Sequence, residues 1–121
     1  MPATRIDNNK RISQGVGYGE MIFLAGQVAD KPVPDAKAQT QDILRKIDSL
    51  LTKLGGSKKN LLSATVYLAD IRHYDAMNAA WDVWVDKTNC PARATVEARL
   101  AKPEYLVEIM VTAHKNEKPG G

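Results

Sequence analysis

The sequence predicts an α+β fold, in which two helices cover one face of a single mixed β-sheet. Several short stretches alternate apolar and polar residues, as half-buried strands do, whereas two longer stretches repeat apolar residues at helical spacing. These stretches follow one another in the order β-α-β-α-β-β. Strands linked through a helix run parallel with right-handed crossovers, which places both helices on the same face. At 121 residues, the whole chain (1–121) is expected to form a single domain.

The first half of the chain supplies a strand and a long helix. Residues 20–28, EMIFLAGQV, read as a strand, and a weaker strand is indicated at residues 11–17. Asp35 can cap the helix that follows. Residues 36–54 carry one apolar stripe, which consists of Ile43, Leu44, Ile47, Leu50, Leu51 and Leu54. Gly55 and Gly56 supply the end of this helix.

The second half adds three strands and another helix. Residues 61–69, LLSATVYLA, alternate as a strand does, and Asp70 then caps a helix over about residues 71–85. Strands are predicted at residues 92–100 and 105–113, separated by the turn AKPE. The two ends of the chain, residues 1–10 and 114–121, are expected to be loose.

The alternation also predicts which side chains face the helices. Two apolar rows are expected on that face, Ala94/Val96/Ala98/Leu100 and Val107/Ile109/Val111/Ala113. The opposite face then carries Thr65, Tyr67, Arg93, Thr95, Glu97, Glu108 and Met110. No further segment remains to cover this second face, so it is either a wet sheet surface or an oligomer interface. Its aromatic and methionine content favours the interface.

Charge and composition do not favour nucleic-acid binding. The net charge is +3, but part of the excess lies at the chain ends, and the internal basic pair Lys58-Lys59 lies next to a glycine turn. A nucleic-acid site needs basic residues clustered on one face. Neither His73 nor His114 has the spacing of a metal ligand pair, and no cofactor motif is present. We therefore expect no metal and no cofactor.

The cysteine content and the absence of long apolar runs bear on the compartment. Cys90 is the single cysteine, so an intrachain disulfide is excluded, as is usual in a reducing compartment. The N-terminal segment has no apolar core of a signal peptide, and no apolar run is long enough to span a membrane. The expected location is the cytoplasm, without a membrane partner.

Three polar residues are candidates for chemistry. The planar fork of Arg93 suits a carboxylate, which it can hold through two parallel hydrogen bonds. Glu108 is the only charge within the apolar stretch YLVEIMVTA, where its pKa can rise and allow proton transfer. Asn78 borders the apolar stripe of the second helix, where an amide needs partners. The alternatives are an Arg93–Glu108 ion pair, two solvated rim charges, and an Asn78 that only ties the helix to a strand.

The chain resembles the reactive intermediate deaminase (Rid) family, also called the YjgF or L-PSP family. The resemblance runs from about residue 11 to residue 113. Its most specific part is PARATVEARL (91–100), which is similar to the family's P-A-R signature, together with the acidic residue of VEIMVTA (107–113). FLAGQVA (23–29) and MNAAWDVW (77–84) are similar to the family's glycine-containing strand and to its second helix.

The resemblance implies a chorismate-mutase-like fold whose last strand inserts antiparallel between the first two crossover-linked strands. It further implies a homotrimer with clefts between subunits, and hydrolysis of 2-imino or 2-enamino acids to 2-oxo acids and ammonia without metal or cofactor. In this reading Arg93 grips the substrate carboxylate and Glu108 handles the water and the protons. The main-chain N–H of Thr95 contacts the substrate, Gly26 lets the backbone approach it, and Asn78 supports the cleft wall.

One position departs from the family pattern. Ile12 stands where the archetype has a tyrosine that reaches the cleft, and Tyr18 and Tyr105 are the candidate replacements. The sequence therefore looks closer to a sister subfamily that keeps the arginine. Three other functions stay open: a non-catalytic trimer that binds small carboxylates, an endoribonuclease and a chaperone.

Overall fold

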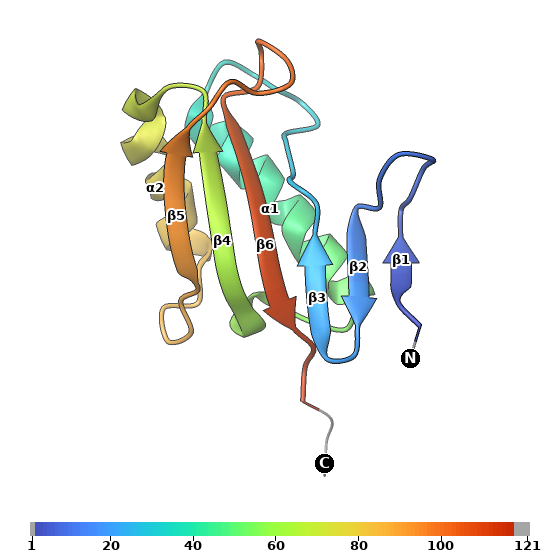
Figure 1. Ribbon diagram of the computed structural model, residues 1–121. Coiled ribbons are helices and arrows are strands. Elements are labelled where there is room, and N and C mark those ends of the chain that lie inside the picture. Colours follow the sequence, from blue (N-terminus) through green and yellow to red (C-terminus); the bar gives the residue numbers. More distant parts are fainter. Residues whose placement is uncertain (1, 118–121) are drawn as a thin grey trace.

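The computed structural model describes residues 2–117 and contains one sheet and one layer of helices (Figure 1). The strands are β1 (Thr4–Ile6), β2 (Gly15–Tyr18), β3 (Met21–Leu24), β4 (Leu61–Leu68), β5 (Ala92–Glu97) and β6 (Val107–His114). The α-helices are α1 (Ala36–Lys53) and α2 (Tyr74–Trp84), and short 3-10 turns, Lys58–Asn60 and Ile71–His73, precede β4 and α2. This arrangement confirms the predicted α+β class.

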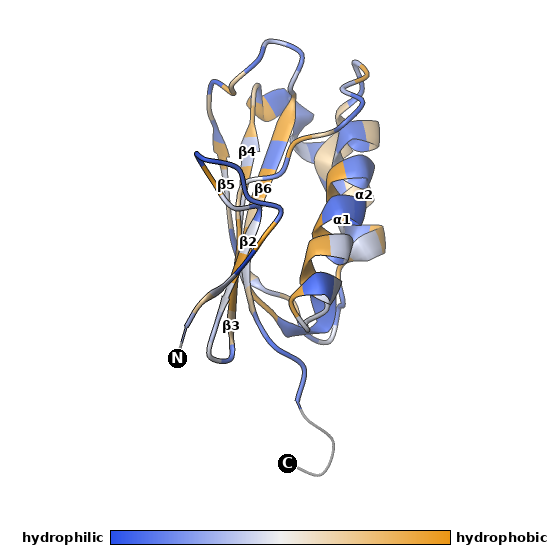
Figure 2. Cartoon of the chain, turned by 90° about the vertical axis from the view of Figure 1, so that its right-hand side faces the viewer, coloured by the Kyte–Doolittle hydropathy of each residue, from blue (hydrophilic) through white to orange (hydrophobic). Residues whose placement is uncertain are grey.

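The strand order in the sheet is β1-β2-β3-β6-β4-β5. The last strand, β6, pairs antiparallel with both β3 and β4, so these two strands run parallel on either side of it. β4 also pairs parallel with β5, which forms one edge of the sheet. The insertion of the last strand between the two crossover-linked strands is therefore confirmed. Both helices pack on the same side, as Figure 2 shows from the edge.

The long helix α1 begins and ends as its sequence predicts. The side chain of Asp35 accepts a hydrogen bond from the backbone N–H of Ala38 at 3.2 Å. At the other end, Gly55 adopts a positive φ of 82°, and Gly56 donates its N–H to the carbonyl of Leu51. Between these caps the apolar stripe of α1 is buried against the sheet, so packing rather than propensity stabilises the helix.

Two predicted boundaries at the chain ends are wrong. Residues 4–6 form the edge strand β1, in which Arg5 pairs with Val16, although a stretch of three residues is too short to give a periodic signal. At the other end, β6 runs to His114, and the backbone N–H groups of Lys115 and Asn116 donate to the carbonyls of Glu20 and Gly55. Of the predicted loose C-terminus, residues 118–121 lie outside the described residues.

Several inner boundaries are shorter than predicted. The strand expected at residues 20–28 ends at Leu24, and only Gln27 forms a further isolated bridge, to Ile109. The strand expected at residues 92–100 ends at Glu97, and the first turn of the expected helix over 71–85 is a 3-10 turn. The weaker strand expected at residues 11–17 is confirmed as β2, with later bounds.

The predicted facing of β5 is wrong. Parallel pairing aligns Arg93 with Ala64 and Thr95 with Val66, both buried under the helices, so Arg93 and Thr95 lie on the helix face. Ala94 and Val96 lie on the open face instead. Alternation alone cannot orient an edge strand, because α2 covers it only partly and meets it with polar and aromatic groups rather than with an apolar core.

The facing of the central strands is confirmed. On β6, the row of Val107, Ile109, Val111 and Ala113 is buried under the helices. Four residues expected on the open face do lie there, with Tyr67 paired to Glu108 and Thr65 paired to Met110. With the corrected facing, this surface also includes the exposed side chains of Val96, Phe23 and Ala94, which makes it more apolar than predicted.

Candidate functional site

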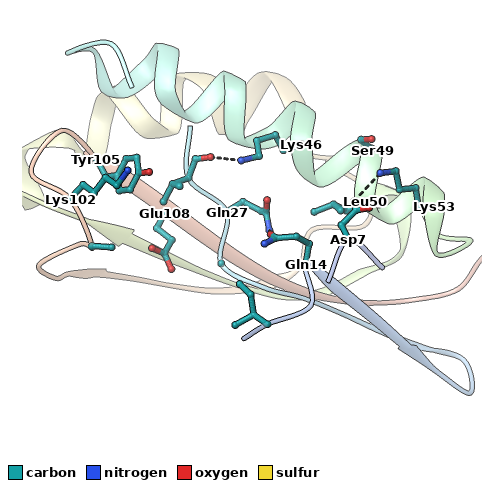
Figure 3. Close-up of a pocket in the computed structure, with 14 residues that line it drawn as sticks. Asp7, Gln14, Gln27, Lys46, Ser49, Leu50, Lys53, Lys102, Tyr105 and Glu108 are labelled. Carbon is teal, nitrogen blue, oxygen red and sulfur yellow. Dashed lines mark hydrogen bonds and ion pairs between the residues drawn. The ribbon is translucent and has the colours of Figure 1, made fainter. Parts of the chain in front are cut away.

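A pocket of about 570 Å³ lies between the loops before β2 and after β3, the α1 helix and the start of β6 (Figure 3). It brings together four of the residues that the sequence singled out: Ile12, Gly26, Tyr105 and Glu108. Its volume lies in the range of small-molecule sites.

Glu108 is one of two acidic residues that line this pocket, and the other, Asp7, forms an ion pair with Lys53. It lies on the open face of β6, and no hydrogen bond or ion pair reaches its carboxylate within residues 2–117. Burial without a counter-charge raises the pKa of Glu108 above its ordinary value, because desolvation disfavours the ionised form. The predicted rise in the pKa of Glu108 is therefore found in the single chain.

The segment that follows β3 holds Gly26 directly against Glu108. A Cβ atom at Gly26 would overlap the carboxylate of Glu108, so only glycine permits this approach. Gln27 fixes the segment, because its backbone exchanges hydrogen bonds with Ile109 at 2.8 and 3.1 Å. Its buried side-chain amide also donates to Gln14 and to the carbonyl of Ala25. Sequence reasoning had not assigned a role to Gln27.

Tyr105 forms another wall of the pocket, and a residue that sequence reasoning missed holds it in place. The fully buried side chain of Gln39, on α1, donates to the carbonyls of Val33 and Glu104 and accepts the N–H of Leu106. Its amide thus clamps the residues on both sides of Tyr105. A glutamine one turn before Ile43, on the apolar stripe of α1, is the signal that could have revealed it, since a buried amide needs partners.

The position of the missing tyrosine, Ile12, and the other candidate replacement, Tyr18, lie in different places. Ile12 lines the pocket from a loop in which the side chain of Asn9 accepts the N–H groups of Arg11 and Ile12. Tyr18 lies at the β2–β3 hairpin, is mostly exposed and does not line the pocket. Of the two candidate replacements, Tyr105 is therefore the one that lines the pocket together with Glu108.

Arg93 occupies a second, separate position at the sheet edge. Its guanidinium donates to the side-chain oxygen of Asn78 at 2.8 Å and lies 5.1 Å from the ring centroid of Trp81 and 6.0 Å from that of Tyr74. No carboxylate forms an ion pair with it within the described residues. The expected tie between Asn78 and a strand is confirmed, whereas the alternative Arg93–Glu108 ion pair is absent from the single chain.

Thr95 lies two residues beyond Arg93 on the same face of β5. Its hydroxyl is buried and has no hydrogen-bond partner. Because β5 is an edge strand, some of its backbone N–H groups face away from the sheet and are free to bind another molecule. This edge therefore combines an uncompensated cation with unused hydrogen-bonding groups.

Arg93 and Glu108 cannot reach one small molecule within a single chain. β4 separates their strands, which at ordinary spacing places them about 10 Å apart across the sheet. Their register adds three residues along the strands, or about 10 Å more. Moreover, Arg93 is on the helix face and Glu108 on the open face. The two groups can meet only if Arg93 belongs to a second copy of the chain.

Neither a metal-binding cluster nor a membrane-spanning helix is found in the described part of the chain. Residues 2–117 contain no cluster of three or more histidine, cysteine or acidic side chains that could hold a metal ion. None of the helices within these residues has the length and apolarity needed to cross a bilayer.

Comparisons with known proteins identify the family. The profile of the family described as "Endoribonuclease L-PSP" matches residues 3–115. The chain belongs to this family, which is the Rid or YjgF family that the sequence motifs indicated. A RutC family protein of Haemophilus ducreyi is 46% identical over 95% of this chain and 98% of its own length. The RutC family protein YoaB of Escherichia coli is 41% identical over 93% and 98% of the two chains.

A solved structure shows that the Rid fold extends over nearly the whole chain. NMB1025 of Neisseria meningitidis, a member of the YjgF family, superposes with a TM-score of 0.95 at 42% identity and covers 98% of both chains. Family membership supports a Rid-type role in general terms.

Proposed function

We propose that this Rid-family protein hydrolyses 2-imino and 2-enamino acids to 2-oxo acids and ammonia, at sites formed between the subunits of a homotrimer. The observation that carries the proposal is the uncompensated guanidinium of Arg93, fixed by Asn78 against two aromatic rings at a sheet edge. Such a group is preorganised to bind a planar carboxylate. A small 2-imino acid carries its carboxylate next to the reacting imine carbon. A side chain that binds the carboxylate therefore also positions the imine carbon.

The open face of the sheet supports assembly. Phe23, Val96 and Met110 are each at least 40% exposed on this face, because no segment of residues 2–117 covers it. Exposed apolar groups gathered on one face are typical of a subunit interface. Packing three such faces together would bring β5 of one copy beside the Glu108 pocket of the next, which is the arrangement that the separation of Arg93 and Glu108 requires.

The substrate is held through its carboxylate. The guanidinium has five N–H donors and uses one nitrogen on Asn78, so two parallel donors remain for the two carboxylate oxygens. A free backbone N–H near Thr95 adds a further donor on the same strand. The pocket walls formed by Ile12 and Tyr105 then surround the substrate side chain, and their apolar surfaces favour short aliphatic groups.

The chemical steps need only water and one carboxyl group. Glu108 accepts a proton from the attacking water as its oxygen bonds to the imine carbon, and it then delivers that proton to the nitrogen. The tetrahedral intermediate collapses to the 2-oxo acid as the C–N bond breaks and the hydroxyl proton leaves with ammonia. An enamine is first protonated at carbon and loses a proton from nitrogen, which gives the imine. A carboxyl group with a raised pKa is suited to this exchange, because it gains and loses a proton readily.

Ammonia release tests the proposal directly. Freshly generated 2-aminoacrylate is incubated with the protein, and the ammonia released is measured against the spontaneous rate and against Arg93→Ala. The proposal predicts acceleration by the wild type alone. A protein that binds 2-oxo acids without accelerating ammonia release would instead be the non-catalytic carboxylate-binding trimer.

The positions of the histidines do not favour RNA cleavage by a histidine pair. His73 follows the end of β4 at Leu68, where that strand pairs with Val107 at the start of β6, whereas His114 lies at the far end of β6. At about 3.3 Å per residue, the two histidines are therefore about 20 Å apart or more along the sheet. We place the enzyme in the cytoplasm, where the free thiol of Cys90 would stay reduced.

Replacing Gly26 by alanine is expected to lower kcat by about 100-fold, because the added methyl group must displace the Glu108 carboxylate from its position. The matched control is Gly17→Ala, whose methyl group would make an ordinary contact with the side chain of Leu54 and keep Glu108 untouched. Steady-state assays on 2-iminobutanoate measure both. Equal kcat values for the two variants would show that the Gly26–Glu108 approach is irrelevant to turnover.

A charge on the open face is expected to break the trimer. Met110→Glu places a carboxylate in the middle of the proposed interface, and burying an unpaired charge is strongly unfavourable. The control is Val83→Glu, which makes a similar change on the helix side of the chain. Sedimentation velocity should show smaller species for Met110→Glu and trimers for the control. A trimeric Met110→Glu protein would contradict the assignment of this face.

A further inference from the structure

A groove of about 490 Å³ between α1 and α2 is separate from the site described above. It lies on the helix layer, on the opposite side of the sheet from the open face, as the edge view shows (Figure 2). Assembly through the open face therefore leaves the groove accessible. It shares no lining residue with the Glu108 pocket.

The apolar part of the groove, called its floor below, combines the exposed Val83 with the half-buried Trp84 and the buried Leu44, and it is partly preorganised. Val83 is 85% exposed, the highest value among the large apolar side chains of the described chain, and Leu44 and Trp84 lie beside it. The indole N–H of Trp84 donates to Asp48 on α1 at 3.0 Å, which fixes the ring across the helix pair. An exposed valine beside an oriented indole offers an apolar side chain a ready contact surface.

The rim of the groove is positively charged. Lys37, Arg45 and Lys58 line it, and no acidic residue of the described chain does. Lys37 and Lys58 form no ion pair within residues 2–117, and the Lys58 ammonium lies 5.6 Å from the ring centroid of Trp84. Arg45 contacts Asp42 at 3.4 Å, but its side chain is exposed and Asp42 also accepts backbone N–H groups from the loop before α1. The rim is therefore left with net positive charge.

The spacing of these cations indicates the size of the ligand. Lys37 and Arg45 are eight residues apart on α1, which corresponds to about 12 Å along the helix. Lys58 approaches from the turn before β4 and lies beside Trp84. A single small anion cannot neutralise cations so far apart, whereas a short peptide with several carboxylates can. The apolar floor between them calls for an apolar side chain in the middle of that peptide.

We propose that this outer groove, lined by Lys37, Arg45, Lys58, Leu44, Val83 and Trp84, docks an acidic segment of a partner protein. An apolar side chain of the segment contacts Val83 and Trp84, and flanking carboxylates pair with the three cations. The charge complementarity sets the partner's character, and the floor distinguishes it from a uniformly charged polyanion. The proposal does not depend on the proposed imine hydrolysis.

Tryptophan fluorescence tests the proposal, because Trp84 lines the groove and a peptide without tryptophan adds no signal. The probe is the peptide acetyl-EELLEE-amide, and the comparison peptides are acetyl-EEGGEE-amide and acetyl-KKLLKK-amide. Saturable binding of the first peptide alone, weakened by added salt, is the expected result. The double variant Lys37→Glu/Lys58→Glu should bind it about tenfold more weakly or worse.

The control double variant is Lys10→Glu/Lys115→Glu, which makes the same charge change away from the groove. It should bind the peptide nearly as the wild type does. The proposal fails if both double variants lose affinity equally, if the glycine peptide binds as well as the leucine peptide, or if single-stranded RNA binds the groove more tightly than the peptide. Ammonia release by Lys37→Glu/Lys58→Glu should be unchanged, which separates this surface from the proposed active site.

Discussion

Replacing Arg93 by lysine is expected to lower kcat/KM for 2-iminobutanoate about 100-fold, mainly through KM. In the wild type the planar guanidinium is held by Asn78 and lies against Trp81, and its remaining donors are free for a carboxylate. A lysine ammonium can bond either to Asn78 or to the substrate, but it cannot offer two parallel donors. Truncating one partner of a desolvated, hydrogen-bonded charge pair costs about 2–5 kcal/mol, and a 100-fold loss corresponds to about 2.7 kcal/mol.

Arg99→Lys is the matched control, because Arg99 is an exposed arginine a few residues farther along the same segment. It should behave as the wild type does. Binding of a 2-oxo acid by calorimetry separates affinity from turnover, and Arg93→Lys should lose affinity in the same proportion. An unchanged dissociation constant for Arg93→Lys would contradict the proposed binding of the substrate carboxylate by Arg93, which is the main support for the proposed reaction.

The architecture was predictable because periodicity and caps agree along most of the chain. The stripe of α1 lies between an aspartate cap and a glycine stop, and the structure places both where the pattern predicts. The buried row of β6 is equally plain, because a central strand between two neighbours must bury one full face. Local and tertiary preferences coincide in these elements, and sequence reasoning succeeds there.

The facing of β5 was not predictable in the same way. Alternation divides the side chains of a strand between two faces, but it does not show which face lies under the helices. The apolar face of an edge strand need not be that face. Here the polar face of β5 meets α2 because Asn78 and the aromatic rings accept Arg93 there, and Ala94 and Val96 are turned outward. The error is informative, since apolar residues on the open face of an edge strand are expected when that face joins another subunit.

The candidate site was predictable as a set of residues but not as a geometry. The P-A-R segment and the acidic residue of the last strand indicated Arg93 and Glu108, and Asn78 was expected to need a partner. No sequence pattern shows that β4 separates the first two, because register and strand order arise from the whole sheet. Gln27 and Gln39 were missed, because single polar residues within apolar stretches reveal neither the loops they hold nor their distance from a pocket.

Replacing Glu108 by glutamine is expected to lower kcat by about 10²- to 10⁴-fold, the usual contribution of a positioned general acid-base group. Glutamine keeps the shape of the side chain beside Gly26 but can neither accept the proton of the water nor deliver one to the leaving nitrogen. The control is Glu104→Gln, an exposed carboxylate in the loop before β6. Wild-type kcat in the control variant would exclude a general effect of charge loss near the pocket.

The pH profile of kcat tests the same assignment through its acidic limb. In the proposed enzyme–substrate complex the substrate carboxylate would neutralise Arg93, and burial would then raise the pKa of Glu108 above its ordinary value of 4.5 as it does in the single chain. The base form is therefore lost as the pH falls through that raised pKa, and kcat falls with it.

The free energy of unfolding changes with pH in the opposite direction to kcat, because the folded protein binds this proton more tightly than the unfolded chain does. With a 2-oxo acid bound to Arg93, wild-type stability should fall as the pH rises from 4.5 through the raised pKa, whereas Glu108→Gln should lack both that fall and the acidic limb. An acidic limb that persists unchanged in Glu108→Gln would assign the titrating group to another residue.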